Sequence, residues 1–329
     1  MHSKEQIQQG LDALRRKYGD WTFNIPLPFD IWTRGNLRIP HTRLKRIVQV
    51  VNDLSQKPIS ESRILDLGCL DGIFPIEFAL HGAESVGVEI REANIKKAIF
   101  CKEVLGLHNL EFRQDDVRNI SVESYGRFDA IVCSGILYHL PAVDAINLIY
   151  TMYEMVNRLI VIDTHVSLET KEQVLHNNIE YWGSTYHEYF GYTTPEEEAK
   201  LTPEEKARLL WAAADNRDSF WFTRPSLINI LSKAGFTSIY ECFVPAHLNF
   251  GKPGLEHMDR CTFVAIKDDI FELETSPDAN RLQENWPERS LTYAPEVKTQ
   301  DIPTPLYKRM LLKLKRMNLE NNINSDQDQ

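Results

Sequence analysis

Short apolar runs alternate with stretches of helical length from Arg63 onward. The runs are RILDLG, SVGVEI (85–90), LEFRQ (110–114), FDAIVCS (128–134) and RLIVIDT (158–164). The helical stretches are 73–82, 91–106 and 141–156. Strands that are buried on both faces read as continuous apolar runs, and their alternation with helices is typical of βαβ units. The pattern therefore predicts an α/β fold, a Rossmann-like doubly wound sheet that is mostly parallel.

Residues 167–222 interrupt this alternation. They are first polar and aromatic and then acidic, and they are too long for an ordinary loop. We expect a lid insertion of helical and aromatic character. The helix PSLINILSKAGF follows, with Gly235 at its C-terminal cap, and strands are expected near 237–244 and 261–267. These two strands lack a long helix between them, which suggests that the pair forms an antiparallel edge.

The two ends of the chain differ in character from the centre. Residues 1–58 predict an N-terminal helical and extended cap, with helices at 3–18 and 41–55. Residues 59–268 form the expected main domain. Residues 269–329 predict a C-terminal extension with a short basic helix at 306–319 and a disordered end.

Composition narrows the class of protein. Hydrophobic residues make up 43% and charged residues 26% of the 329-residue chain, which excludes a wholly disordered protein. The net charge of −10 disfavours sequence-independent binding of nucleic acid. The five cysteines suggest neither a disulfide framework nor a zinc ribbon, and no metal site is expected. A polar N-terminus and the lack of a long apolar run predict a soluble, cytoplasmic protein with no membrane span.

The stretch LDLGCLDG carries the chemistry. A strand ends at Asp66, and Gly68 and Gly72 permit a tight turn into a helix. Glu89 follows Asp66 by 23 residues, where an acid accepts both hydroxyls of a ribose. Leu70 would crowd a pyrophosphate and Asp66 would repel it, whereas an ammonium group suits the same place. The turn therefore favours S-adenosylmethionine (SAM) over a dinucleotide.

The next strand ends extend the same site. Asp115 and Asp116 follow the third strand, where an acid meets the adenine amino group. Ser134 ends the fourth strand, and Tyr138 and His139 follow it beside the expected methyl group. One small ligand would thus touch four strand ends in order.

These stretches resemble the class I SAM-dependent methyltransferases over roughly residues 60–268, although Leu70 stands where that family usually has glycine. Within the superfamily, GILYHL, FWFTRPSLINILSKAGF and RCTFVAIK resemble the tRNA wobble-uridine 5-carboxymethoxyuridine-forming transferases, which use a carboxylated SAM. That resemblance implies that Tyr138 and Arg260 hold the extra carboxylate and that Trp32 lies nearby. Because a buried carboxylate needs several cationic partners and only Arg260 can be named, ordinary SAM is favoured.

Two sets of residues form the expected site. The expected cofactor-binding residues are Trp32, Arg34, Asp66, Gly68, Cys69, Asp71, Gly72, Glu89, Ile90, Asp115, Asp116, Val117, Ser134 and Tyr138. The expected substrate-binding residues are Tyr181, Trp182, Tyr186, His187, Trp221 and Arg260. The aromatic density of the second set suits a flat aromatic or heterocyclic acceptor, and the alternative is that these rings pack onto the sheet.

Catalysis needs positioning and, for an oxygen or nitrogen acceptor, a base near the proton. The expected catalytic residues are His139, Tyr138 and His165, with Asp163, His187 and Glu188 as further candidate bases. The first functional hypothesis is a methyltransferase that modifies an O or N atom of a small molecule. The second is a tRNA-modifying (carboxy)methyltransferase, for which Arg43, Lys45, Arg46 and the basic helix would contact the RNA. The third is a non-catalytic cofactor-binding scaffold, and a homo-oligomer remains open.

Overall fold

The computed structural model describes residues 2–35, 41–188, 212–242 and 259–281, together with residues 200, 202, 205 and 209. Met1–Glu288 form one compact unit, and the second unit, Arg289–Gln329, lies outside the described residues. The predicted basic helix and disordered end therefore also lie outside them, as does most of the acidic part of the insertion.

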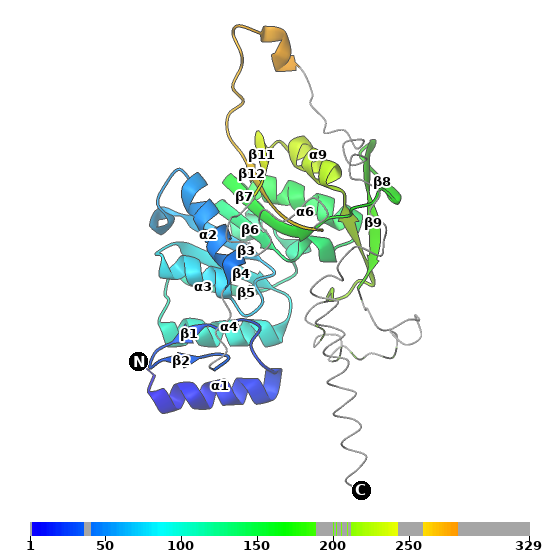
Figure 1. Ribbon diagram of the computed structural model, residues 1–329. Coiled ribbons are helices and arrows are strands. Elements are labelled where there is room, and N and C mark those ends of the chain that lie inside the picture. Colours follow the sequence, from blue (N-terminus) through cyan, green and yellow to red (C-terminus); the bar gives the residue numbers. More distant parts are fainter. Residues whose placement is uncertain are drawn as a thin grey trace. The chain divides into compact units, whose positions relative to one another are not determined.

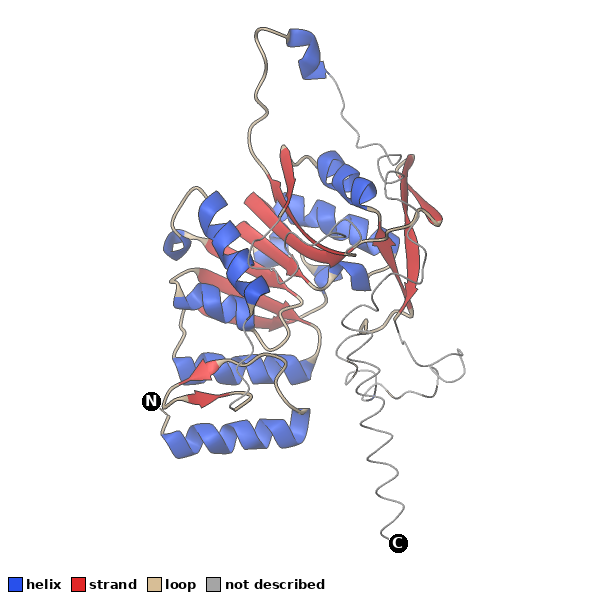
Figure 2. Cartoon of the chain, in the orientation of Figure 1, coloured by secondary structure: helices blue, strands red, loops and turns tan. Residues whose placement is uncertain are grey.

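A seven-stranded sheet forms the centre of the first unit, in the order β11-β12-β7-β6-β3-β4-β5 (Figures 1 and 2). The strands are β3 (Arg63–Leu67), β4 (Glu84–Glu89), β5 (Leu110–Gln114), β6 (Phe128–Ser134), β7 (Val156–His165), β11 (Ser238–Glu241) and β12 (Arg260–Ile266). The strands from β5 to β7 are parallel, whereas β12 is antiparallel to both β7 and β11. The predicted α/β fold, mostly parallel with an antiparallel last strand, is confirmed.

The last two strands form the expected antiparallel edge, with β11 outermost. β12 inserts between β7 and β11, so β11 occupies the edge. Cys261 to Ile266 are all buried, because both faces of β12 are covered. An apolar strand of this kind is stable inside a sheet, and the half-exposed β11 is the better edge.

Helices cover both faces of the sheet (Figure 1). Alternate strand residues such as Ile64, Val132 and Val161 join one core with α1 to α4, and Leu65 and Ile131 join a second core with α6 and α9. The helices are α1 (Lys4–Tyr18), α2 (Thr42–Leu54), α3 (Ile73–Leu80), α4 (Glu92–Leu105), α5 (Val122–Tyr125), α6 (Ala142–Met155) and α9 (Arg224–Ala234). Short 3₁₀ turns include η1 (Ile59–Glu61), η2 (Val117–Asn119), η3 (Leu137–His139) and η5 (Pro277–Arg281).

The N-terminal segment forms the two expected helices, α1 and α2, and a small hairpin between them. Ser3 begins α1 with a capping box completed by Gln6, and α1 contacts α4. Between α1 and α2, β1 (Pro26–Leu27) and β2 (Ile31–Trp32) form a small antiparallel hairpin. Among the described residues, no helix combines the length and apolarity needed to cross a membrane.

The polar and aromatic part of the insertion is a sheet, whereas most of the acidic stretch expected to be helical lies outside the described residues. β8 (Glu172–His176), β9 (Ile179–His187) and β10 (Asp218–Phe222) form an antiparallel sheet in the order β10-β9-β8. Asn177 and Asn178, both with positive φ, make the two-residue turn between β8 and β9. Asparagine tolerates this backbone conformation, and two such residues are the typical signal of a tight hairpin. Tyr181 and Gly183 are buried on β9 and their neighbours are less so, as in a half-covered strand.

Candidate active site

The turn after β3 has the left-handed backbone that a glycine-rich loop requires. Gly68, Leu70 and Gly72 have φ values of 67°, 50° and 89°. Leu70 therefore adopts a conformation that favours glycine, at a cost of roughly 1 kcal/mol. Glu89 at the end of β4 compensates, because its Oε2 accepts a hydrogen bond from the Leu70 amide at 3.0 Å and its Oε1 accepts one from the Arg91 amide at 2.8 Å.

A pocket lies at the carboxyl ends of β3 to β6, with about 990 Å³ of space including its open mouth. Parallel α/β sheets bind ligands at this edge. Twelve of the predicted site residues line it: Asp66, Gly68, Cys69, Glu89, Ile90, Asp115, Asp116, Val117, Ser134, Tyr138, His139 and Arg260. The structure thus brings together residues from 66 to 260 along the chain.

Three polar atoms in the pocket wall are buried without a hydrogen-bond partner among the described residues. They are Asp66 Oδ2, Arg91 Nε and Ser134 Oγ. Burial raises the pKa of Asp66 well above its ordinary value and Glu89 adds to the effect, whereas Arg43 opposes it. Native proteins rarely leave such atoms unpaired, so their clustering in one pocket indicates a polar ligand.

Two carboxylates follow β5 in defined positions. Asp115 accepts a hydrogen bond from the Tyr125 hydroxyl at 2.7 Å and one from the Asp116 amide at 2.8 Å. Asp116 accepts hydrogen bonds from the amide and guanidinium of Arg118. Burial alone would raise the pKa of both aspartates, but these donors hold it below the ordinary value. Both side chains are therefore ionised and fixed at neutral pH.

Guanidinium groups collect at the other end of the pocket, around Asp163. Arg260 donates to Asp163 Oδ1 from Nε at 2.8 Å, and Arg43 donates to the same oxygen from Nη1 at 3.3 Å. Burial would raise the pKa of Asp163, but Arg260 and Arg43 hold it below its ordinary value. Arg260 also lies 5.5 Å from the ring centroid of Tyr138. Two guanidinium groups on one carboxylate leave a net positive charge beside Tyr138.

His139 lines the pocket and is held from behind by a carboxylate. Its Nδ1 lies 2.9 Å from Glu188 Oε2, and both residues are buried. The same Oε2 accepts a hydrogen bond from the Ala213 amide at 2.8 Å. No described residue forms a hydrogen bond with Nε2, which is thus available to a ligand.

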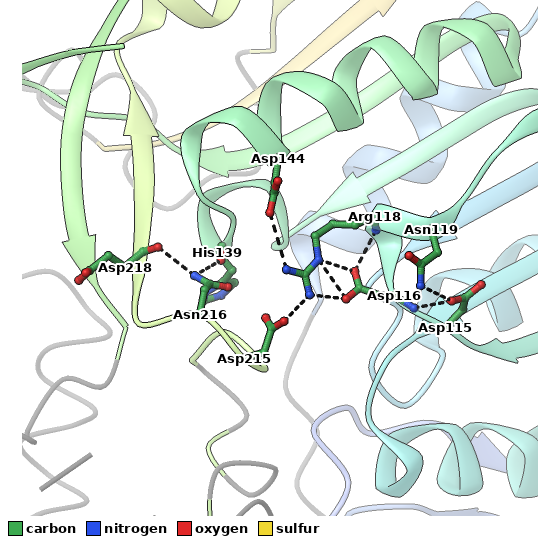
Figure 3. Close-up of polar contacts among 9 residues, drawn as sticks. All are labelled: Asp115, Asp116, Arg118, Asn119, His139, Asp144, Asp215, Asn216 and Asp218. Carbon is green, nitrogen blue, oxygen red and sulfur yellow. Dashed lines mark hydrogen bonds and ion pairs between the residues drawn. The ribbon is translucent and has the colours of Figure 1, made fainter. Parts of the chain in front are cut away.

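Residues 212–217, which we call the strap, cover the pocket from the side of the insertion; five of them line it. The strap is held at three strand ends. Arg91, after β4, donates to the Ala212 carbonyl at 2.7 Å. Arg118, after β5, forms an ion pair with Asp215, and Asn216 donates to the carbonyl of His139, after β6, at 3.0 Å (Figure 3).

A family model described as a methyltransferase domain matches residues 39–241, more than half of the chain. The chain belongs to this methyltransferase family. Two curated ubiquinone biosynthesis O-methyltransferases are similar to this methyltransferase. The enzyme of Acinetobacter baylyi is 30% identical over 83 residues, and that of Chromobacterium violaceum is 33% identical over 89 residues. Each match covers 25% of this chain and 35% of the relative, so the chain matches about a third of the length of these relatives.

A solved structure is similar over a longer range. The N-terminal domain of EvdMO1, crystallised with SAH bound, aligns with a TM-score of 0.58 at 23% identity. The alignment covers 82% of the methyltransferase described here and 98% of that chain. This likeness shows a shared fold.

Four residues expected to bind the cofactor lie outside the pocket wall of the methyltransferase. Trp32 Nε1 donates to Asp30, and Arg34 donates to the Thr22 carbonyl. Asp71 is fully buried and accepts hydrogen bonds from the Thr22 and Phe23 amides. A Cβ at Gly72 would lie 2.6 Å from the Phe112 ring, so this glycine serves packing.

Phe23 and Arg43 line the pocket instead, although the sequence did not point to them as cofactor contacts. Phe23 lies at the pocket because the hydrogen bonds of Asp71 hold residues 22–23 against the turn after β3. In the sequence, the stretch around Phe23 is distinguished only by its many proline and aromatic residues (21–36). Such composition indicates an ordered segment but no particular contact.

The predicted substrate-binding aromatics are not among the residues that line this pocket. Tyr181 is fully buried in the core, contrary to expectation, because it lies on the covered face of β9. Trp221 stacks on Tyr186 at 4.5 Å and on His165 at 4.7 Å between ring centroids. His187 pairs with Asp218 on the surface. Trp182, another residue of the predicted set, donates its backbone amide to Ser226 Oγ.

His165, predicted as catalytic, lies next to the pocket rather than in its wall. Its ring stacks on Trp221, and its Nε2 lies 3.2 Å from Arg260 Nη1. Burial lowers the pKa of His165, and Arg260 adds to that effect, although Asp259 opposes both. We therefore assign it to the support of Arg260 and Tyr138.

Proposed function

We propose that this protein transfers a methyl group from SAM to an O or N atom of a small molecule. The observation that carries the proposal is the set of carboxylates at successive strand ends, together with the unpaired buried atoms of Asp66 and Ser134. Membership in the methyltransferase family supports the reaction type. The SAH bound to the N-terminal domain of EvdMO1 supports the cofactor.

The pocket residues fit SAM by chemistry and position. Glu89 would accept the ribose hydroxyls, and Asp115 or Asp116 would face the adenine amino group. The unpaired oxygen of Asp66 would accept a hydrogen bond from the ammonium group of the cofactor. When bound, SAM supplies a methyl group made electrophilic by the adjacent sulfonium.

The chain contributes positioning, exclusion of water and a base. The strap closes one side of the pocket, and a water-excluded site favours a reaction that consumes positive charge. His139 would take the proton of the acceptor atom at Nε2, because Nδ1 faces Glu188. Tyr138 would orient the acceptor, since Arg260 and the rings of His139 and His165 fix its own ring.

A small-molecule acceptor agrees with a pocket enclosed between strand ends and the strap. The curated relatives support an O atom as the acceptor, as their names state an O-methyltransferase activity. Support for an aromatic acceptor rests on Phe23, Phe74 and Tyr138, which line the pocket, rather than on the aromatics of the insertion.

Calorimetric titration with SAM and SAH tests the cofactor, and incubation of methyl-labelled SAM with a small-molecule extract tests the transfer. We expect Glu89→Gln to weaken SAH binding by about 10-fold to 100-fold, because a charge-assisted hydrogen bond contributes about 1.5–3 kcal/mol. Glu84→Gln is the matched control, since Glu84 begins the same strand at its far end and pairs with Arg63. Failure of the unchanged protein to bind either ligand would favour a non-catalytic scaffold.

A carboxylated SAM used in wobble-uridine modification of tRNA is the second candidate. The observation that favours it is Arg43, which adds a second guanidinium group to Arg260 beside Tyr138. Two cationic partners suit an extra carboxylate better than one. Mass analysis of the small molecule that copurifies with the protein distinguishes the donors. Binding of tRNA that weakens steeply with salt would support this candidate, and no binding at low salt would end it.

A further inference from the structure

We propose that Glu188 is a positioning residue that fixes the tautomer and orientation of His139 and joins the strap to it. This inference rests on the proposed function, because it assigns a role within the same methyl-transfer site. Glu188 directly follows β9 of the insertion, whereas His139 follows β6 of the central sheet. Their contact therefore links the two parts of the pocket.

The contact is short and inaccessible to solvent. Oε2 of Glu188 lies 2.9 Å from His139 Nδ1, and the exposed fraction of the Glu188 side chain is 0%. The backbone of His139 is fixed independently, because its amide donates to the Ile136 carbonyl and its carbonyl accepts from Asn216. With the backbone fixed, the carboxylate determines how the ring is turned.

A carboxylate accepts hydrogen bonds but does not donate them, so the proton must be on Nδ1 of the neutral ring. Nε2 then carries a lone pair, and His139 lines the pocket. The proton that the acceptor atom loses as it gains the methyl group goes to Nε2 and later to solvent. Glu188 stabilises the imidazolium that exists in between.

Stability alone does not account for Glu188. Its second oxygen, Oε1, is buried without a partner among the described residues. A buried carboxylate with a bare oxygen is costly, and an apolar side chain would avoid that cost. An unsatisfied buried polar atom in a native structure calls for an explanation, and the positioning of His139 supplies one.

The strap depends on the same oxygen. Oε2 accepts a hydrogen bond from the Ala213 amide at 2.8 Å as well as from His139. Ala213 and Asn216 both line the pocket, and Asn216 holds the His139 carbonyl. A strap displaced from this position loses its bond to the carboxylate that orients the ring, so closure of the pocket and readiness of the base are coupled.

The test uses the full-length protein with SAH, labelled with ¹⁵N at histidine. Long-range proton–nitrogen spectra report which nitrogen of each ring carries the proton, and loss of one signal set in His139→Gln assigns His139. We expect the Nδ1–H form in the unchanged protein. Glu188→Gln should keep that form, since its amide oxygen can accept both bonds. Glu188→Met has no such acceptor and should lose the preference for Nδ1–H.

Activity with the identified acceptor provides the second readout. We expect kcat to fall by about 10-fold in Glu188→Gln, which keeps both hydrogen bonds and should leave KM for SAM and SAH affinity within about twofold. In Glu188→Met we expect kcat to fall by about 100-fold or more, whereas SAH affinity should weaken by no more than about fivefold as the strap loses its bond to Glu188. Asp218→Asn is the matched control, because Asp218 forms a carboxylate–imidazole pair with His187 on the same sheet outside the pocket. It should leave both the His139 tautomer and kcat unchanged.

The outcomes separate this inference from the proposed function. An Nε2–H ring in the unchanged protein, or a tautomer unaffected by Glu188→Met in a folded, SAH-binding protein, overturns the role of Glu188. If Glu188→Met does not fold, Glu188→Gln decides: an unchanged kcat, or a loss confined to KM, overturns the inference. Failure of the unchanged protein to bind SAH contradicts the proposed function but leaves the tautomer result interpretable.

Discussion

Arg118 Nη2 and Asp215 Oδ2 lie 2.5 Å apart, so an ion pair fastens the strap to the segment after β5. The same guanidinium binds Asp116, which faces the pocket, and lies near Asp144 at the start of α6 (Figure 3). One cation thus joins three carboxylates from separate parts of the chain. Because Asp116 follows the strand end that would meet the adenine, strap closure and cofactor binding are expected to depend on each other.

Asp215→Asn is expected to speed SAH dissociation by about twofold to fivefold, because an exposed ion pair contributes up to about 1 kcal/mol. Stopped-flow displacement of SAH measures the rate. The difference from the unchanged protein should shrink at high salt, which screens exposed charges. Asp218→Asn makes the same change beyond the strap and should have no effect. Equal dissociation rates at low salt would show that the ion pair does not hold the strap.

Gly72→Ala is expected to lower the free energy of unfolding by about 3 kcal/mol, and Gly106→Ala by about 1 kcal/mol. Both glycines have positive φ, at 89° and 66°. An added Cβ at Gly72 would lie 2.6 Å from the Phe112 ring, whereas nothing lies within 4 Å of one at Gly106. The difference between the two variants therefore measures the clash alone. Urea unfolding gives both values, and equal losses would mean that Phe112 moves away freely.

The central sheet was predictable because its strands are buried on both faces and so form unbroken apolar runs. RILDLG and FDAIVCS became β3 and β6 almost residue for residue. The insertion was harder to predict, since β9 mixes tyrosine, tryptophan and glycine, and only Asn177 and Asn178 marked its hairpin. A composition rich in aromatic residues does not by itself distinguish a sheet from a helical lid.

The site was predictable where chemistry follows a strand end and not where it depends on distant contacts. Asp66, Glu89 and Asp116 could be placed because parallel strands bring their carboxyl ends together. The role of Asp71 could not be predicted, because its hydrogen-bond partners lie about 50 positions earlier in the chain. The pairing of Glu188 with His139 likewise joins residues 49 positions apart. No local spacing encodes such a contact.

Asp71 connects the N-terminal segment to the turn after β3 at an electrostatic cost. Burial raises its pKa to about 6, although the Phe23 amide and Lys97 act in the opposite direction. The folded state therefore retains a proton that the unfolded chain has already released above its ordinary pKa of about 3.9. The stabilisation from this proton is complete below that value and is lost as pH rises through 6.

Asparagine at position 71 cannot ionise. The free energy of unfolding of Asp71→Asn should therefore rise relative to that of the unchanged protein as pH increases. Between pH 5 and pH 8 we expect the difference in free energy of unfolding to move toward the variant by about 1–3 kcal/mol. Urea unfolding at intervals of one pH unit measures it. Asp268→Asn is the control: the Arg158 hydrogen bond lowers the pKa of Asp268, so its titration falls below this range and the difference should stay flat. A flat profile for Asp71→Asn as well would mean that Asp71 is ionised throughout, its charge balanced by Lys97 and the two amides.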